Sequence, residues 1–347
     1  MDVIYMKKIT IRDIAREAGV SISTVSNALN HVDVLSDETK RKVFDAAEKL
    51  NYIPNLNGKF LRSRQSKMIG FFTTSLSGWY FNVLIEAISR ECDRQGYGLQ
   101  VIFTRDKEMI LSHIFGERID GVILFEENFI HKKEIQFMQE QELSCVFLDR
   151  AYKSEKMSSI VFDSYQSAVT ACEYLIGLGH RKIGFISGSK TMFDSSERFK
   201  GYCDTMKRFS LAIEEKYLLD GLFEEHASYI AVKAFLHANP NDLPDAFIAG
   251  NDLSAIGCMK ALQSQGYCVP QDISVLGFDD IDIAPYFSPA LTTLKNPVAQ
   301  QGTLAVQKLL SLIQTQQAGE IIKLDSRLVI RSSCDFNSRN IASTPIA

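Results

Sequence analysis

A stretch near the N-terminus, GVSISTVSNALN at residues 19–30, carries side chains suited to contacting another molecule. We expect a short helix here whose outward face presents Ile22, Ser23, Ser26 and Asn27 and no charge. Small polar side chains let a helix approach base edges, hydroxyls donate to phosphates, and asparagine pairs with adenine through two hydrogen bonds. The stretch therefore predicts a helix that enters the major groove of DNA. An ordinary helical hairpin with a solvated face is the alternative.

No residue pattern in the sequence is typical of catalysis or of metal binding. The GYG stretch at 96–98 lacks the third glycine of a dinucleotide fingerprint, and the GSK stretch at 188–190 lacks the spacing of a phosphate-binding loop. The seven cysteines form no C-x-x-C pair, and the six histidines are dispersed. We expect reduced cysteines, no metal, no cofactor and no enzyme activity.

The composition is that of a globular protein with two or three domains. Of the 347 residues, 46% are hydrophobic and 23% are charged, and a domain commonly spans ~100–200 residues. No apolar run approaches the ~20 residues of a membrane-spanning helix, and the first residues lack a signal-peptide core. We therefore expect a cytoplasmic protein without a membrane partner.

The charge is distributed unevenly along the chain. The net charge is −4, yet residues 1–67 contain 12 Lys and Arg against 8 Asp and Glu. A basic end on an acidic body predicts that the N-terminal end is the part that meets a polyanion.

Three helical patterns and no strand pattern fill the first 50 residues. Thr10 is a suitable N-cap with Asp13 at the third helical position, and Gly19 ends this first helix. Ser21 can cap a second helix, and a third follows. A helix, a glycine turn and a second helix form a helix-turn-helix motif, so residues 8–53 are expected to be a DNA-binding domain.

Residues 54–67 have the polar, basic composition of a hinge and linker. From residue 68 to 337, apolar runs alternate with amphipathic helices, which predicts parallel sheets covered on both faces. The runs are MIGFFTT, YGLQVIF, DGVILFE, CVFLD, KIGFISG, DAFIAGN and ISVLGFDD. SSIVFDS and PALTTLKNP are expected to cross between two doubly wound lobes, whose ligands bind beyond the carboxyl ends of the strands. Residues 338–347 are expected to be a loose tail.

These motifs resemble those of the lactose-repressor (LacI/GalR) family of bacterial transcription regulators. The resemblance begins with TIRDIAREAGVSISTVSNALN and LSDETKRKVFDAAEKLNYIPN. It continues over nearly the whole chain through YLIGLGHRKIGFISG, RFKGY, AFIAGNDLSAIGCMKAL and VPQDISVLGFDDIDIAPYFSPALTTL. It implies a homodimer or tetramer with a periplasmic-binding-protein-like core, and a repressor controlled by a small sugar or sugar derivative bound between the lobes.

The resemblance also implies how the chain contacts a pseudo-palindromic operator. The helix after Thr10 crosses the backbone, and the next lies in the major groove, where Ile22, Ser23 and Asn27 choose bases. Residues 54–62 form a hinge helix that orders on DNA and inserts Leu61 into the minor groove. The expected DNA contacts are Thr10, Ser21, Ile22, Ser23, Thr24, Ser26, Asn27, Asn30, Asn55, Gly58, Lys59 and Leu61.

The same resemblance implies an effector site in the cleft. Arg198 has planar donors that can bind two adjacent hydroxyls, and carboxylates, an amide and aromatic faces accompany it. The expected effector contacts are Trp79, Tyr80, Phe81, Asp149, Asp163, Arg198, Asn251 and Asp279. Structural roles are the alternative, because Asp149 and Asp279 could cap helices and Tyr80 and Phe81 could pack in the core.

Several residues depart from the family's pattern. Asn27 stands where the family usually has arginine, so the operator is expected to differ. Gly58 replaces an alanine, which makes the hinge helix less stable by roughly 0.5–1 kcal/mol. Met192 and Asp194 stand where purine-responsive relatives carry arginine and threonine, which favours a sugar over a nucleobase.

Two rival functions follow from the same features. One is a catabolite-control regulator whose co-repressor is a phosphorylated carrier protein. The other is a sugar-binding transport receptor, which could share the two-lobed core. A receptor would need an export signal and would have no use for residues 1–62, so the N-terminal sequence argues against it.

Overall fold

The computed structural model describes residues 9–29, 34–52, 65–76, 78–116, 119–125, 129–315 and 317–337. The chain divides into two compact units, Met1–Ser66 and Lys67–Ala347, and each is described by itself. Some predicted features lie outside the described residues, namely Asn30, Asn55, Gly58, Lys59, Leu61, the hinge helix at 54–62 and the tail at 338–347.

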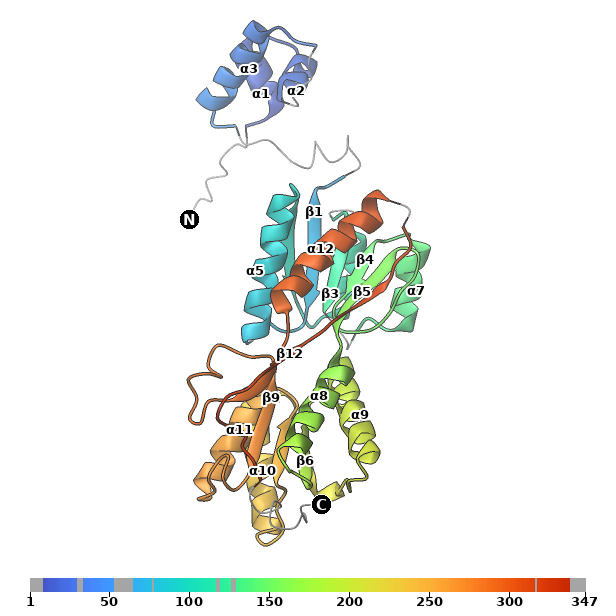
Figure 1. The fold of residues 1–347 in the computed structure, drawn as a ribbon. Coiled ribbons are helices and arrows are strands. Elements are labelled where there is room, and N and C mark those ends of the chain that lie inside the picture. Colours follow the sequence, from blue (N-terminus) through green and yellow to red (C-terminus); the bar gives the residue numbers. More distant parts are fainter. Residues whose placement is uncertain are drawn as a thin grey trace. The chain divides into compact units, whose positions relative to one another are not determined.

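The described part of the first unit holds three helices, as the sequence predicts: α1 (Ile11–Ala18), α2 (Ile22–Leu29) and α3 (Asp37–Lys49) (Figure 1). The backbone N–H of Thr10 donates to the Asp13 carboxylate at 3.0 Å at the start of α1. Gly19 ends α1 with a left-handed φ of 66°, which glycine adopts without strain. The Ser21 hydroxyl caps α2 by accepting from the Thr24 N–H at 3.1 Å.

A small apolar core holds these helices together. Ile14 of α1, Val25 of α2 and Val43 of α3 are fully buried and pack against one another with the alanines beside them. Because a three-helix unit of this size buries little apolar surface, each of these contacts is a large share of its stability.

The second unit begins with an α/β lobe, called here the N-terminal lobe. Its all-parallel sheet has the order β11-β5-β4-β3-β1-β2. The strands are β1 (Met68–Thr73), β2 (Gly98–Phe103), β3 (Gly121–Phe125), β4 (Cys145–Phe147), β5 (Met157–Phe162) and β11 (Ile321–Leu324). Helices α5 (Trp79–Arg94) and α12 (Val298–Gln314) cover one face, and α6 (Lys107–Phe115) and α7 (Lys132–Glu140) cover the other (Figure 1).

The other lobe, called the C-terminal lobe, repeats this plan. Its sheet has the order β12-β10-β9-β8-β6-β7 and is parallel except for the β10–β12 pair. The strands are β6 (Ile183–Ser187), β7 (Leu218–Asp220), β8 (Ala246–Ala249), β9 (Ser274–Phe278), β10 (Thr292–Lys295) and β12 (Arg327–Val329). Helices α8 (Ser164–Gly177) and α9 (Phe193–Arg208) cover one face, and α10 (Glu225–Ala238) and α11 (Asp252–Ser264) cover the other.

Successive strand residues point to opposite faces, which explains why whole runs of sequence are apolar. Phe71 packs under α5 and α12, whereas the next residue, Phe72, packs under α6 and α7. Both side chains are fully buried. A parallel sheet covered on both sides therefore needs an apolar residue at every strand position, as the sequence predicts.

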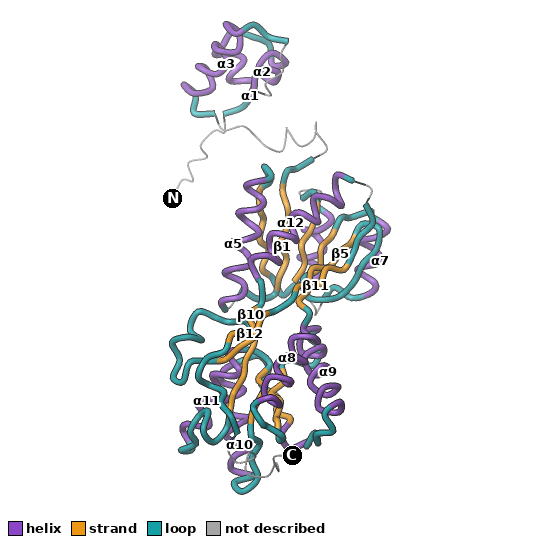
Figure 2. Tube along the Cα trace, in the orientation of Figure 1, coloured by secondary structure: helices purple, strands orange, loops and turns teal. Residues whose placement is uncertain are grey.

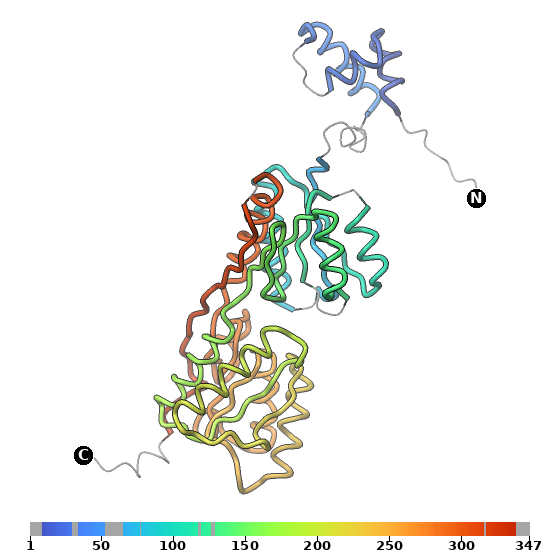
Figure 3. Tube along the Cα trace, turned by 90° about the vertical axis from the view of Figure 1, so that its right-hand side faces the viewer, coloured from blue at the N-terminus to red at the C-terminus, as the bar shows by residue number. Residues whose placement is uncertain are grey.

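Three segments of the described chain cross between the lobes (Figure 2). The predicted crossings are confirmed, from β5 to α8 and from β10 to α12. A third, from β11 to β12, was not predicted. It lies beside the first, because the Asp163 N–H donates to the Leu324 carbonyl at 2.9 Å. In Figure 3 the green, orange and red crossing segments run together along one side.

Candidate functional site

A pocket of about 270 Å³ lies where the carboxyl ends of strands from both lobes meet, which is where doubly wound sheets bind ligands. Its N-terminal-lobe residues are Thr73, Thr74, Ser75, Gly78, Trp79, Tyr80, Phe81, Phe125, Asp149 and Phe162. The remaining lining residues are Met192, Asp194, Arg198, Phe223, Asn251, Leu253, Asp279, Ile281 and Asn296. Seven of the eight predicted effector residues are therefore brought together here.

The wall from the N-terminal lobe is largely aromatic. Tyr80 and Phe81 stand in the first turn of α5, and their ring centroids lie 5.2 Å apart. Phe125, at the end of β3, lies 5.2 Å from the ring of Phe81. Phe81 is 7% exposed and packs in the core as well, whereas Trp79 and Tyr80 are only partly buried. The wall can therefore offer the faces of Trp79 and Tyr80 to a ligand.

Arg198 dominates the opposite wall. It is 3% exposed, and its guanidinium lies 4.5 Å from the centre of the Phe278 ring. One terminal nitrogen donates to the Gly250 carbonyl, and the other lies 3.7 Å from a carboxylate oxygen of Asp279. Nε has no hydrogen-bond partner within the described chain. A buried arginine with an unused donor can bind a further acceptor.

The loop after β9 carries Asp279 and depends on a second buried carboxylate. Asp279 and Asp280 have left-handed φ values of 110° and 57°, which are uncommon for residues with a side chain. Asp252, fully buried, accepts from the Ile281 N–H at 2.9 Å and from the Thr293 hydroxyl at 2.5 Å. Burial raises the pKa of Asp252 well above its ordinary value. These bonds fix the loop that points Asp279 into the pocket.

Asp279 is an acceptor whose charge depends on pH near neutrality. Burial raises its pKa to about 6, and Asp194 adds to the rise, whereas Arg198 and Asn296 oppose it. The Asp279 side chain is one-fifth exposed and lines the pocket. The Asn296 side-chain N–H₂ donates to its Oδ1 at 2.8 Å.

Asp149 and Asn251 line the pocket but also have partners within the protein. Arg150 pairs with the Asp149 carboxylate at 2.8 Å. The Asn251 side chain caps α11 by accepting from the Ser254 N–H at 2.8 Å, and it donates to the Phe223 carbonyl at 3.1 Å. These bonds hold both side chains at the edge of the pocket, where Asn251 keeps further donor and acceptor capacity for a ligand.

Asp163 is the predicted effector residue that does not line this pocket. Its carboxylate caps α8 by accepting from the Gln166 N–H at 3.2 Å and lies 3.6 Å from the ammonium group of Lys323. The first crossing places it at the N-terminus of a helix, where a carboxylate satisfies free N–H groups. A structural role therefore accounts for Asp163.

Several lining residues were not named from the sequence as ligand contacts. They include Asn296 and the aromatic residues Phe125, Phe162 and Phe223. Phe125 and Phe162 are the last residues of β3 and β5, so their position at the carboxyl ends of strands was a usable signal. Asp194, noted only as a departure from purine-responsive relatives, also lines the pocket and accepts from the Ser164 hydroxyl at 2.6 Å.

The exposed face of α2 has the character that the sequence predicts. Ser21, Ile22 and Ser23 are exposed, Ile22 by 44%, and Ser26 and Asn27 are half-buried. The Ser21 hydroxyl lies 2.7 Å from that of Ser23. No side chain on this helix is charged, so small polar groups and one apolar side chain make up the whole face.

The described residues contain no group of His, Cys, Asp and Glu side chains that could hold a metal ion. Nor does any helix among them have the length and hydropathy to cross a membrane.

Comparisons with known proteins agree with this architecture. Residues 10–55 match the model for bacterial regulatory proteins of the lacI family, and residues 172–334 match a periplasmic binding protein-like domain. The chain is 34% identical to the probable HTH-type transcriptional repressor ExuR of Bacillus subtilis, over 94% of this chain and 98% of that protein. It is 31% identical to the HTH-type transcriptional repressor PurR of Mannheimia succiniciproducens, over 93% and 98%.

A solved structure supports the same assignment. The lac repressor dimer bound to operator and the anti-inducer ONPF superposes with a TM-score of 0.83 at 27% identity, over 95% of this chain and 100% of that chain. A helix-turn-helix unit followed by a two-lobed binding core defines a class of DNA-binding transcriptional regulators. The chain belongs to the LacI family within that class.

Asp279 should make the stability of the protein depend on pH. Because its pKa is raised from 3.8 to about 6, the folded state holds more protons than the unfolded state between these values, and the free energy of unfolding falls as pH rises. In the Asp279→Asn variant, the decrease in the free energy of unfolding with pH should be smaller by up to about 3 kcal/mol. Urea unfolding of both proteins from about pH 4 to about pH 7 measures this difference. Equal slopes of the free energy of unfolding against pH would contradict the raised pKa of Asp279.

Proposed function

We propose that this chain is a homodimeric repressor that places α2 in the major groove of its operator, and that a small sugar without a phosphate binds the interlobe pocket and controls operator affinity. The proposal includes a hinge helix at 54–62 with Leu61 in the minor groove, as the family resemblance implies. The observation that carries the effector assignment is the division of the pocket into an aromatic wall and a polar wall built around buried Arg198.

A sugar fits this division chemically. A pyranose ring has flat faces of C–H groups and a rim of hydroxyls that both donate and accept hydrogen bonds. Trp79 and Tyr80 offer aromatic surface to a C–H face. Arg198 and Asp279, whose charged groups lie 3.7 Å apart, offer donors and acceptors together, which adjacent hydroxyls can satisfy simultaneously.

The charges of the pocket favour an unphosphorylated sugar. Its charged lining residues are Asp149, Asp194, Asp279 and Arg198. The Asp149 carboxylate is paired with Arg150, so two carboxylates remain for one guanidinium. A phosphate dianion would meet the two carboxylates of Asp194 and Asp279 and the one guanidinium of Arg198, so that repulsion outweighs attraction.

A panel of candidate effectors tests the pocket assignment. The panel is D-glucose, D-galactose, D-ribose, D-glucuronate, glucose 6-phosphate and hypoxanthine, each added to the full chain in a thermal unfolding assay. At least one unphosphorylated sugar should stabilise the protein, by about 2.7 kcal/mol at ~100 times its Kd. Glucose 6-phosphate should stabilise less than glucose.

Two arginines of the same helix provide a matched control for this assay. Arg198→Lys removes the planar fork and should abolish most of the sugar's stabilisation. Arg208→Lys changes an exposed residue of α9, paired with Glu173, and should leave the stabilisation intact. Stabilisation by hypoxanthine alone, or an equal response in the Arg198→Lys protein, would contradict the sugar assignment.

Asn27 should determine part of the operator sequence. An asparagine in a major-groove helix pairs with adenine through two hydrogen bonds, whereas an arginine pairs with guanine, and each such pair contributes ~1–3 kcal/mol of discrimination. The Asn27→Arg variant should therefore exchange adenine for guanine at one position of each half-site, as a selection from randomised operators would show. Tighter binding to all sequences without a changed base would mean that only the added charge acts.

A further inference from the structure

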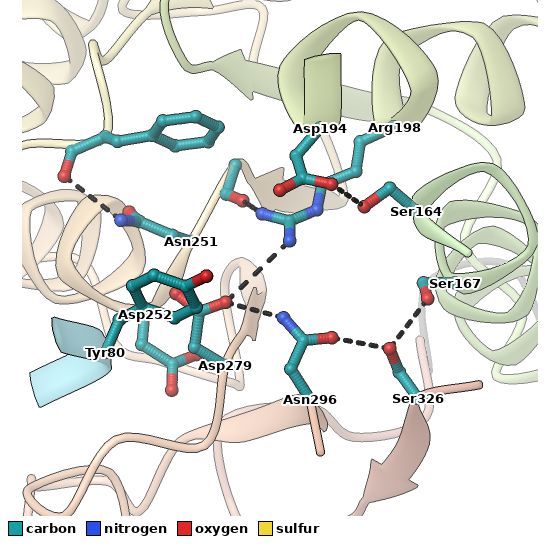
Figure 4. Close-up of polar contacts among 12 residues, drawn as sticks. Tyr80, Ser164, Ser167, Asp194, Arg198, Asn251, Asp252, Asp279, Asn296 and Ser326 are labelled. Carbon is teal, nitrogen blue, oxygen red and sulfur yellow. Dashed lines mark hydrogen bonds and ion pairs between the residues drawn. The ribbon is translucent and has the colours of Figure 1, made fainter. Parts of the chain in front are cut away.

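One chain of hydrogen-bonded side chains reaches all three crossings between the lobes, as Figure 4 shows. It consists of Asp279, Asn296, Ser326 and Ser167, which we call the crossing relay. Asn296 lies between β10 and α12, Ser326 between β11 and β12, and Ser167 in the first turn of α8 after the remaining crossing. The relay begins at the carboxylate that lines the effector pocket.

The chemistry of the groups fixes the direction of these bonds. The Asn296 N–H₂ donates to Asp279 at 2.8 Å, and the Ser326 hydroxyl donates to the Asn296 carbonyl at 2.5 Å. The Ser167 hydroxyl lies 3.0 Å from Ser326 Oγ and 2.8 Å from the Asp163 carbonyl, so it can donate to either. Because an ionised carboxylate only accepts, Asn296 and Ser326 present their donors toward Asp279, and Ser167 completes the relay when its hydroxyl donates to Ser326.

Two members of the relay, Asn296 and Ser167, are buried, whereas Asp279 and Ser326 are partly exposed. Asn296 is 3% exposed and Ser167 is 4% exposed. A buried polar group that loses its partner keeps the full cost of desolvation, so the loss of one bond destabilises the other bonds of such a network. A displacement at Asp279 is therefore passed to the segments that join the lobes.

The second crossing also reaches the other wall of the pocket. Gln301, fully buried in the first turn of α12, accepts from the Tyr80 hydroxyl at 2.8 Å. Its N–H₂ donates to the Ile160 carbonyl at 2.8 Å. The same short segment thus fixes Asp279 through Asn296 and Tyr80 through Gln301, one on each lobe.

We propose that Asn296 and Ser326 are positioning residues that tie the Asp279 carboxylate to all three crossings, so that a ligand engaging Asp279 sets the geometry with which the lobes close. The inference rests on the proposed effector function of the pocket. Both residues act through their links to the crossings, so neither needs to touch the sugar. Ser326 does not line the pocket at all, which makes it the better residue for a test.

Amide hydrogen exchange of the ligand-free full chain tests the relay without any sugar. Ser326→Ala should speed exchange at least about fivefold at the N–H groups of Ser167 and Val298, which lie on the other two crossings and bond to Asp163 and Asn296. Ser326→Thr keeps a hydroxyl and should restore slow exchange. The matched control is Ser112→Ala, on the exposed side of α6, which should change neither amide. Faster exchange confined to residues 324–328 would overturn the relay.

Operator titration tests the regulatory part of the proposal. Each panel sugar that stabilises the wild-type protein is added to wild type, Ser326→Ala and Ser112→Ala. In the Ser326→Ala protein the sugar's Kd should change less than about threefold, while the sugar-induced change in operator affinity falls by more than threefold. A full operator response would overturn the proposal. If no sugar stabilises the wild type, the effector assignment fails, while the exchange experiment decides the relay independently.

Discussion

The buried guanidinium of Arg198 is the feature on which the rest of the binding core depends. A cation that is 3% exposed is costly unless its surroundings compensate. Here three groups at the ends of two strands supply the compensation: the Gly250 carbonyl after β8, the Phe278 ring at the end of β9 and the Asp279 carboxylate beyond it. Parallel strands bring these ends to one edge of the sheet, and the left-handed turn at Asp279 follows from the need to face Arg198.

The two lobes contribute different chemical groups to this pocket, and this difference determines which ligands contact both lobes. The N-terminal lobe presents most of the aromatic rings, and the C-terminal lobe presents Arg198 with Asp194 and Asp279. A ligand that used only one wall would bind equally well to open and closed arrangements, and equal affinity shifts no equilibrium. A ligand that needs both walls must favour the arrangement that brings them together. In the proposed function, binding of the sugar and closure of the lobes are therefore coupled.

The sequence predicted most of the fold because a strand that is buried on both faces of a parallel sheet is an apolar run. It predicted seven lining residues because their positions match those of a known family. The third crossing was not predicted because β11 and β12 are short strands with exposed, charged residues. Asn296 was not predicted as a pocket residue. Its partners Asp279 and Ser326 are 17 and 30 residues away in the sequence, and no local pattern reveals them. The sequence does not distinguish the two roles of Asp163, because a carboxylate after a strand suits a ligand and a helix cap equally well.

The DNA-binding unit follows a different logic from the binding core. Its helices are held by a few small apolar side chains, and the face of α2 carries no charge. Such a unit gains specificity from close approach, because serine and asparagine are short, and it relies on phosphates for affinity elsewhere. A short uncharged helix cannot hold an operator tightly by itself. In the proposed homodimer two copies bind at a fixed spacing, and closure of the lobes would change that spacing. Modest coupling at the pocket would then be enough for control, because it would act on two weak contacts at once.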